Sequence, residues 1–241
     1  MVYRLIQVTD CHLLTDPTAT LRDTNTYQTL KNMLLHLVTE AHDALVFTGD
    51  LAQDEKASTY QHYLDLTQHW PAPIYWLPGN HDDPVSMERV LCTEPWHTSK
   101  HVDLGPWRII LLNSHWPHHI DGHLSAAELQ RLTALLDEHE GPVLLFVHHH
   151  LTYTEMGLAN TAEFLERLVP YQNRIQAIIS GHVHAENDTL FEGFCHLTTP
   201  STCFQFKMID DKVTIDSTSP GYRMLTLHDD GTWHSEVRRI K

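Results

Sequence analysis

Short apolar runs rich in β-branched residues recur along the chain and have the length of buried strands. They occupy residues 3–8, 44–47, 74–77, 143–147 and 175–179. Between them, apolar residues recur at helical spacing over residues 25–42, 58–69, 84–91, 125–139 and 161–168. Strands that alternate with helices are typical of βαβ units, so we expect a largely parallel core.

Two of the predicted helices carry recognisable start signals. Thr24 or Asn25 precedes the helix expected at residues 25–42, and either side chain could serve as its N-cap. Ser125 and Glu128 have the spacing of a capping box at the start of the helix expected at residues 125–139. Both patterns favour helices packed on the outside of a sheet.

The remaining strands predict a different arrangement. Residues 101–104 and 107–113, joined by Gly105 and Pro106, are typical of a hairpin. Near the C-terminus, alternating segments separated by Gly, Pro and Asp turns occur at residues 195–198, 204–208, 213–217, 222–227 and 233–237. We expect these last segments to form an antiparallel sheet. The whole chain, residues 1–241, then forms one domain with two sheets face to face and helices outside.

Composition places the chain among ordinary globular proteins. Of its 241 residues, 41% are hydrophobic and 20% are charged. No apolar run is long enough to span a bilayer, and residues 1–8 lead directly into a strand, so we expect neither membrane association nor a signal peptide. Cys11, Cys92, Cys195 and Cys203 form no CxxC pair, which suits a reducing, cytoplasmic setting.

The net charge argues against one class of binding partner. Lys and Arg total 16 against 31 Asp and Glu, which gives a formal net charge of −15. Nucleic acids are bound by clustered Lys and Arg, so this charge argues against a nucleic-acid partner. A small phosphate substrate is still compatible, because divalent metals reverse the sign of the local field. The 21 histidines are the unusual feature, and only their positions can separate ligands from background.

Polar residues directly follow the first three predicted strands, where α/β sheets place their chemistry. Asp10 and His12 follow residues 3–8, and in extended backbone both point to the same face, so we expect them to reach one ion. The alternative is a capping Asp beside an exposed His. Asp50 follows the second strand after a glycine, and a Pro-Gly turn after the third presents Asn80 and His81.

Histidines follow two further strands. His148, His149 and His150 come after residues 143–147, and we expect at least one of them to be a ligand. His182 and His184 follow residues 175–179 after a glycine and repeat the same-face spacing of the first pair.

Another histidine-rich loop, at residues 115–119, could line the mouth of the site. We prefer the interpretation of an exposed polar loop for it.

These strand ends supply oxygen and nitrogen ligands for two metal ions. The candidate ligands are Asp10, His12, Asp50, Asn80, His148, His182 and His184. The set is too large for one ion and suits two ions with one bridging carboxylate. His, carboxylate and amide ligands suit Fe, Mn or Zn, and the lack of cysteine ligands disfavours a structural zinc site. Two metals ~3.5–4 Å apart are the arrangement for in-line displacement at phosphorus.

The order and approximate spacing of these motifs resemble the calcineurin-like metallophosphoesterase family over almost the whole chain. The shared elements are Asp10-x-His12, Gly49-Asp50, Gly79-Asn80-His81-Asp82, a histidine run after a strand, and Gly181-His182-x-His184. The resemblance implies an α/β fold, a four-layer α/β/β/α sandwich of two mixed β-sheets flanked by helices. It also implies two divalent metal ions per chain, with Fe²⁺, Mn²⁺ or both preferred and Zn²⁺ compatible.

Within this family the chain is similar to the bacterial class III cyclic nucleotide phosphodiesterases. The similar segments are residues 48–54, 76–82, 199–207 and 220–223. Residues 200–207 matter most, because they lie outside the general metal motif. One departure is Leu151, where those enzymes typically have a proline after the histidine run. It leaves the choice between His148 and His149 open. We prefer His148, the first residue after the strand, which matches the family's ligand position.

The resemblance assigns a role to each motif residue. It gives the first metal Asp10, His12 and His184, the second metal Asn80, His148 and His182, and the bridging position Asp50. It makes His81 the catalytic residue, which stabilises the transition state or protonates the leaving 3′-oxygen. Asp82 either orients His81 or shapes the turn. The substrate would contact His12, Asp50, Asn80, His81 and His184, with Asn25, Thr26 and residues 198–201 as further lining elements.

The implied reaction is hydrolysis of 3′,5′-cyclic AMP to 5′-AMP by a metal-bridging hydroxide, which lowers cellular cyclic AMP. A broader hydrolase of small phosphodiesters on the same site is the main alternative. A non-catalytic scaffold is a remote alternative, since all the ligands and His81 are present. The charge of −15 disfavours a nuclease of the same superfamily. The only partner expected is the small-molecule substrate, and the sequence gives no expectation about oligomeric state.

Overall fold

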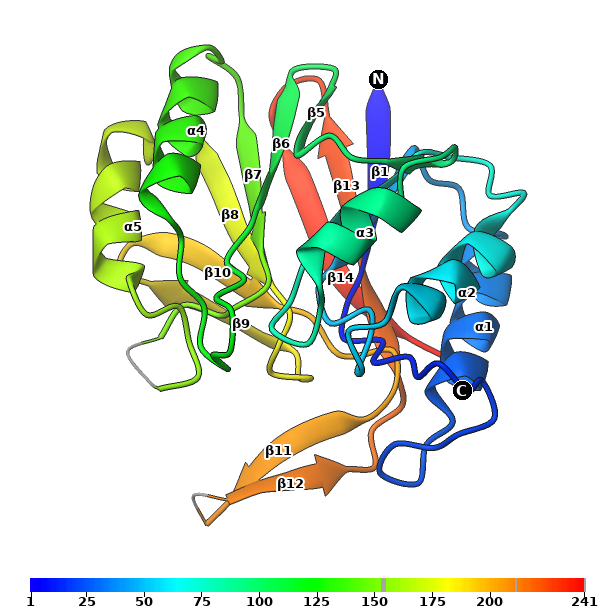
Figure 1. The fold of residues 1–241 in the computed structure, drawn as a ribbon. Helices are drawn as coiled ribbons and strands as arrows, with labels where there is room; N and C mark the ends of the chain where they lie inside the picture. The colour runs from blue at the N-terminus through cyan, green and yellow to red at the C-terminus, as the bar shows by residue number, and fades with distance from the viewer. Residues whose placement is uncertain (153–154, 211, 241) are drawn as a thin grey trace.

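Two six-stranded sheets pack face to face in the structure, a computed structural model that describes residues 1–152, 155–210 and 212–240 (Figure 1). The first sheet contains, in order, β14 (Trp233–Arg239), β13 (Gly221–His228), β1 (Val2–Val8), β2 (Ala44–Thr48), β3 (Ile74–Leu77) and β4 (Trp96–His97). The second contains, in order, β5 (His101–Leu104), β6 (Trp107–Leu112), β7 (Val143–Val147), β8 (Ile175–Ser180), β10 (Phe194–Thr198) and β9 (Asn187–Phe191).

Helices cover the outer face of each sheet (Figure 1). Beside the first sheet lie α1 (Thr26–Leu37), α2 (Ala57–Thr67) and α3 (Pro84–Val90). Beside the second lie α4 (Ala126–Asp137) and α5 (Thr161–Leu168), which the 3₁₀ turn η1 (Val169–Tyr171) follows. None of the described helices is long and apolar enough to cross a membrane.

Three apolar layers hold these elements together. Leu30 of α1 packs on the outer face of the first sheet, and Leu132 of α4 and Phe164 of α5 pack on the outer face of the second. Val46 and Phe146 belong to the layer between the sheets. Because β2 and β7 are buried on both faces, they read as continuous apolar runs. The expected four-layer sandwich is therefore confirmed.

Parallel strands bring the loops of the site to one edge of the sandwich. β1, β2, β3 and β4 pair in parallel, as do β6, β7, β8 and β10, while the strands outside these runs pair antiparallel. The carboxyl ends of β1, β2, β3, β7 and β8 therefore open toward the same edge, at the bottom of the view in Figure 1.

The expectation of one antiparallel C-terminal sheet is wrong. β13 and β14 join the first sheet beside β1, whereas β10 joins the second sheet parallel to β8. β11 (Gln205–Ile209) and β12 (Lys212–Asp216) form a separate two-stranded hairpin. Alternation predicts a strand but not its partner. The short β4 and the largely exposed β9 carry too weak an apolar pattern for prediction.

The first helix is shorter than expected. Asn25 accepts a hydrogen bond from the Gln28 amide and is the N-cap, which settles the choice between Thr24 and Asn25. The helix ends at Leu37 rather than near residue 42. Leu37 is its last buried residue, and Val38 is already 44% exposed. Ser125 caps α4 by accepting from the Glu128 amide, as the capping-box pattern predicts.

Candidate metal centre

Loops from both sheets converge on one cluster of polar side chains. Those after the first-sheet strands are Asp10 and His12 (after β1), Asp50 (after β2), and Asn80 and His81 (after β3). Those after the second-sheet strands are His148 (after β7) and His182 and His184 (after β8). All are buried except Asn80 and His81, which are half-buried. The structure thus brings together every ligand candidate predicted from sequence.

The backbone that presents these side chains is not extended, so the same-face argument for Asp10 with His12 and for His182 with His184 is wrong. These four residues have φ values of 55°, 48°, 70° and 49°, in the left-handed region that residues other than glycine seldom adopt. The Asp10 amide donates to the Gly49 carbonyl at 3.0 Å and the His12 amide to the Asp50 carbonyl at 2.8 Å. These bonds hold the strained loops in place.

Asp10, His12 and His184 form the first ligand group. The Nε2 atoms of His12 and His184 lie 3.0 Å apart, and the His184 Nε2 lies 3.5 Å from Asp10 Oδ1. Nδ1 of His184 lies 2.8 Å from the Phe204 carbonyl and donates to it. This bond leaves the Nε2 lone pair of His184 pointing into the group.

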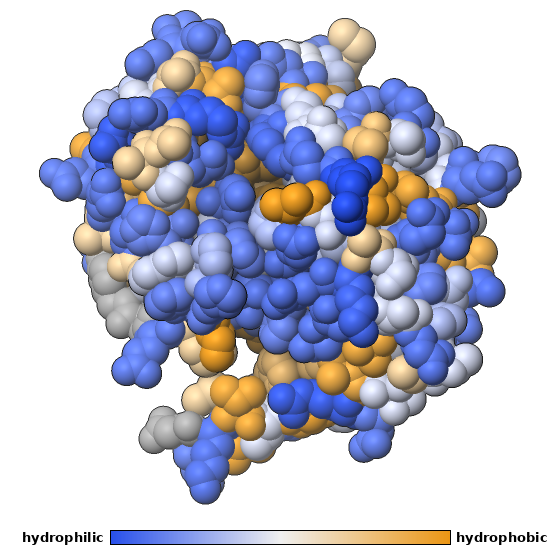
Figure 2. All heavy atoms as spheres, viewed as in Figure 1, coloured by the Kyte–Doolittle hydropathy of each residue, from blue (hydrophilic) through white to orange (hydrophobic). Residues whose placement is uncertain are grey.

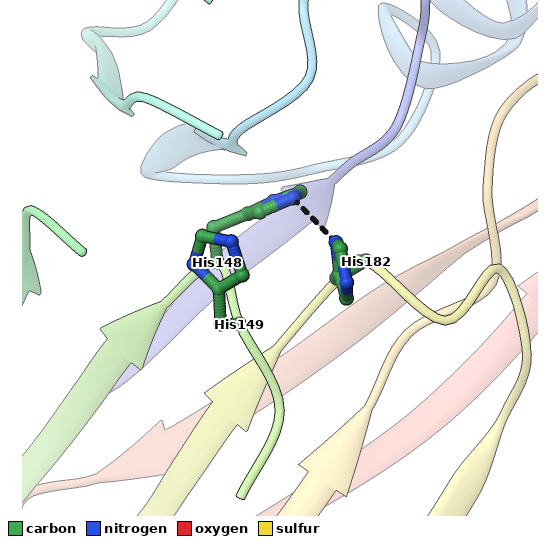
Figure 3. Close-up of side chains that lie close together, drawn as sticks. All are labelled: His148, His149 and His182. Atoms are coloured by element: carbon green, nitrogen blue, oxygen red, sulfur yellow. Dashed lines mark hydrogen bonds between the residues drawn. The ribbon is translucent and has the colours of Figure 1, made fainter. Parts of the chain in front are cut away.

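Asn80, His148 and His182 form the second group. His148 Nε2 lies 3.3 Å from Asn80 Oδ1 and 3.2 Å from His182 Nδ1. Figure 3 shows the His148 and His182 rings turned toward each other from the ends of β7 and β8. His148 Nδ1 donates to the Thr48 carbonyl at 2.9 Å, so its Nε2 faces the group.

Asp50 lies between the two groups. Its Oδ2 is 3.5 Å from Nε2 of His12 in the first group and 3.4 Å from Nε2 of His148 in the second. Its Oδ1 accepts from the His81 amide at 2.9 Å. A carboxylate in this place can contact an ion in either group.

The donor set fits two divalent ions. Ligand atoms bound ~2.1 Å from one ion lie about 3.0–3.4 Å apart, close to the 3.0–3.5 Å found within the two groups. Four buried imidazoles and two buried carboxylates would be costly to desolvate together without such ions.

Burial sets the protonation of these ligands in the absence of metal. It lowers the pKa of His12 to about 4 and that of His182 well below its ordinary value, so both rings are neutral at pH 7. Burial raises the pKa of Asp10 to about 7. Burial alone would lower the pKa of His148, but the facing Asp50 carboxylate outweighs it and raises the pKa to about 9. An incoming ion therefore displaces protons.

The three histidines of residues 148–150 have different hydrogen-bond partners. Nδ1 of His149 lies 2.7 Å from Ser114 Oγ and its Nε2 lies 3.1 Å from the Ile120 carbonyl, so both nitrogens are engaged outside the groups. Figure 3 shows its ring beside that of His148. His150 Nε2 contacts Thr152 Oγ1 at 3.2 Å. Of the three, His148 is the one whose free nitrogen faces Asn80 and Asp50.

The loop at residues 115–119 is partly a support of the site. His118 and His119 are exposed, as the preferred interpretation expects. His115 instead is half-buried, and its Nδ1 donates to the Gly79 carbonyl at 2.9 Å. It therefore braces the loop that carries Asn80.

His81 stands at the open side of the cluster. Its Nδ1 lies 3.1 Å from Gln53 Nε2, and this contact orients the ring so that its own Nε2 points away from Gln53. Its ring lies 5.2 Å from that of His12. Sequence reasoning assigned Gln53 no role, because no local pattern reveals that it reaches His81.

Comparison with known proteins agrees with this geometry. A model of the family described as calcineurin-like phosphoesterase matches residues 3–186. The chain belongs to the calcineurin-like phosphoesterases. The resemblance noted from the motifs is thereby confirmed.

Curated relatives of this calcineurin-like phosphoesterase match along its whole length. It is 35% identical over 253 residues to the 3′,5′-cyclic adenosine monophosphate phosphodiesterase CpdA of Haemophilus influenzae, covering 100% of this chain and 91% of the relative. It is 35% identical to the CpdA of Escherichia coli K12, covering 98% and 90%. A dimetal phosphatase from Danio rerio has a similar fold, with a TM-score of 0.66 at 14% identity over 93% and 95% of the two chains.

Two glycines of the calcineurin-like phosphoesterase motifs let the backbone pass close to the carboxylates of Asp50 and Asp10. A Cβ at Gly79 would lie 2.2 Å from Asp50 Oδ1, and one at Gly181 would lie 2.1 Å from Thr9 Oγ1 and 2.7 Å from Asp10 Oδ2. The loops therefore pass directly over the carboxylates of neighbouring strands. This contact explains why glycine precedes Asn80 and His182.

The loop at residues 198–201 supports the calcineurin-like phosphoesterase site through the backbone of Asp10. Ser201 is fully buried, and its hydroxyl donates to the Asp10 carbonyl at 2.7 Å. Thr199 is also fully buried and donates to Gln7 Oε1. Asn25 and Thr26 are likewise used at the start of α1. The side chains of Thr199, Ser201 and Asn25 bond to other residues of the chain, and their contact with substrate stays a prediction.

Proposed function

We propose that this chain is a metal-dependent phosphodiesterase that hydrolyses 3′,5′-cyclic AMP to 5′-AMP. The observation that carries the proposal is the pair of buried ligand groups on either side of Asp50, with His81 at their open side. Full-length similarity to relatives named as cyclic AMP phosphodiesterases supports the choice of substrate.

In this proposal the two ions are held as the ligand groups suggest. Asp10, His12 and His184 would hold one ion, Asn80, His148 and His182 would hold the other, and Asp50 lies where it could serve both. When bound, two divalent ions, Fe²⁺ or Mn²⁺ in preference, acidify a water molecule and neutralise charge on the phosphoryl oxygens. His148 and Asp10 must lose their protons before they can serve, as their raised pKa values require.

His81 would supply the proton in the reaction. The contact between Nδ1 and the Gln53 side chain orients the ring, and the backbone amide of His81 fixes the loop to Asp50. In the imidazolium form of His81, the Nε2 proton can pass to the 3′-oxygen as its bond to phosphorus breaks, which leaves a neutral ring and avoids expelling an alkoxide. The substrate itself would lie against His12, Asp50, Asn80, His81 and His184.

The proposal also includes the binding partner and the cellular compartment. A small cyclic nucleotide is the partner, and the formal charge of −15 is unsuited to nucleic acid. Cys11, Cys92, Cys195 and Cys203 are all unpaired, which suits a reducing cytoplasm.

The test is a paired measurement on one preparation. Metal content per chain is determined by mass spectrometry, and the products from cyclic AMP are identified by chromatography. We expect about two metals per chain and 5′-AMP as the product. Equal turnover of 2′,3′-cyclic nucleotides and glycerophosphodiesters would replace the proposal with a broad hydrolase. No turnover after addition of Mn²⁺ or Fe²⁺ would refute an enzymatic role.

A further inference from the structure

An aromatic side chain stands beside the candidate metal centre without a role in it. Phe206 lies near the start of β11, in the hairpin that projects below the cluster in Figure 1. Its ring lies 4.6 Å from the ring of His184, whose Nε2 belongs to the first ligand group. Phe206 is half-buried, whereas the neighbouring Phe204 is buried against His184. Phe206 therefore presents an aromatic surface that is next to the site and partly open to solvent.

A second planar group lies over this ring. The guanidinium carbon of Arg22 is 5.5 Å from the centroid of the Phe206 ring and 5.9 Å from that of Phe204. Arg22 is exposed and makes no ion pair with any residue that the structure describes. In a chain with a net charge of −15, an unpaired cation beside a site for an anionic substrate is notable.

The backbone of Arg22 is fixed in an unfavourable shape. Leu21 and Thr24 exchange backbone hydrogen bonds at 2.9 Å, which closes a tight turn. Arg22 and Asp23 at its tip have φ values of 49° and 63°. Such conformations cost energy in residues other than glycine and cluster at functional sites.

Space for a ligand adjoins the Phe206 ring. A cavity of about 280 Å³ is lined by Phe206, His184, Lys207 and Arg239, among others. Figure 2 shows the molecule hollowed beside the projecting hairpin, with apolar atoms gathered there. Cross-strand pairing places Met208 on the same face of the hairpin as Phe206, two residues farther out. The apolar face therefore begins at the metal centre.

We propose that Phe206, together with Arg22, binds the nucleobase of the substrate. Bases stack on aromatic rings and on guanidinium planes, and both kinds of surface are present here. Only a ribose separates base from phosphate in a nucleotide. A phosphate at the ligand groups therefore places the base near the ring that contacts His184. This inference rests on the proposed function in taking a nucleotide as the substrate.

Equilibrium binding of the product tests the base site without turnover. Calorimetry on the metal-loaded protein compares 5′-AMP with ribose 5-phosphate, which lacks the base. Phe206→Leu keeps an apolar side chain but removes the ring, and we expect it to weaken 5′-AMP binding about 10-fold. Binding of ribose 5-phosphate should not change. Arg22→Gln should weaken 5′-AMP binding by about 3-fold.

Two variants serve as controls. Phe206→Tyr keeps the stacking surface and should retain 5′-AMP affinity. Met208→Leu changes an exposed apolar residue farther along the same hairpin and should have no effect. Equal loss of both ligands in Phe206→Leu, or equal affinity of the unmodified chain for both, would overturn the base site. A selective loss of 5′-AMP in a chain that does not hydrolyse cyclic AMP would support the base site and refute the proposed function.

Discussion

His81 differs from the other histidines of the cluster in what its two nitrogens face. It is half-buried, and its Nδ1 contacts a side chain, Gln53 Nε2, rather than a backbone carbonyl. The buried imidazoles of His148 and His184 instead use one nitrogen on a backbone carbonyl and turn the other toward the ligand groups. This division separates a residue that moves a proton from residues that hold an ion.

Replacing His81 should therefore separate chemistry from metal binding. We expect His81→Ala to keep about two metals per chain and to lower kcat for cyclic AMP by ~10²-fold, the usual scale for losing a general acid. Metal analysis and steady-state kinetics on the same sample check this. His118→Ala, which changes an exposed histidine, is the control. Full activity in the His81 variant would remove its assigned role.

Among elements, the loops after β2 and β3 are tied together by Asp82. Its carboxylate accepts hydrogen bonds from the amides of Ala52 and Gly79, each at 2.9 Å, from the Leu51 amide at 3.2 Å and from the Tyr60 hydroxyl at 3.1 Å. Asp82 therefore shapes the turn, and none of these four hydrogen bonds reaches His81. Asp50 and Asn80 are thereby held at a fixed separation.

Removing this clamp should reduce both stability and metal binding. Asp82→Ala leaves three buried amides and one hydroxyl without their acceptor, and we expect a loss of about 2–4 kcal/mol in the free energy of unfolding. Urea denaturation measures it. Asp83→Ala removes only the N-cap of α3 and should cost about 1 kcal/mol. Equal losses in the two variants would contradict the clamp.

A partly buried lysine links β3 to the segment before β5. Lys100 Nζ donates to the Trp76 carbonyl at 3.1 Å and lies 3.0 Å from the centroid of the Trp76 ring. Burial lowers its pKa to about 7, and Glu88, Glu128 and Arg131 are the charged groups that act on it. The unfolded chain keeps this proton to about pH 10.4.

Stability should therefore rise with pH because of Lys100. Between about pH 7 and 10 the unfolded chain binds more protons than the folded one. The free energy of unfolding therefore increases with pH over this range, and the contribution of Lys100 is fully lost once the pH falls below about 7. Lys100→Met should reduce the rise between pH 7 and 9 by about 1–2 kcal/mol, measured by urea denaturation. Lys31→Met, at an exposed position of α1, should leave it unchanged. An unaltered slope in Lys100→Met would exclude this cause.

The sequence predicts the bounds of single helices and strands better than the contacts between them. β7 and α5 begin and end where the pattern predicts, because continuous apolar runs and helical spacing are local signals. The convergence of the candidate ligands could be predicted because they directly follow such runs. The pairing of β13 with β1 is a contact between distant segments that no local pattern contains. Gln53 and Arg22 reach the site through the same kind of contact.

Across the whole molecule, one fully buried arginine joins the two sheets. Arg223 of β13 donates to the Thr198 carbonyl at 2.9 Å and to Thr199 Oγ1 at 3.1 Å, and its guanidinium pairs with Asp188 of β9. Thr199 in turn bonds to Gln7 of β1. This network crosses the space between the sheets directly behind the ligand groups.

Breaking this link should weaken the sandwich as a whole. We expect Arg223→Leu to lower the free energy of unfolding by about 3 kcal/mol, because buried carbonyl and hydroxyl groups lose their donor. Chemical denaturation checks the value. Arg238→Leu, which removes a partly exposed arginine bonded to Glu40 and Glu236, should cost at most about 1 kcal/mol. Similar costs for both variants would argue against a special role for the buried residue.

Each ligand group draws residues from both sheets, and this has a consequence for the life of the protein in the cell. Asp10 comes from one sheet and His184 from the other, as do Asn80 and His148. Ions bound there fasten the two halves, and each adds RT ln(1 + [M]/Kd) to the folded state. Scarcity of the metal would then shorten the lifetime of the chain against proteases as well as stop its turnover. For a chain that acts on cyclic AMP as proposed, metal supply would thus affect both how much folded enzyme is present and how fast it works.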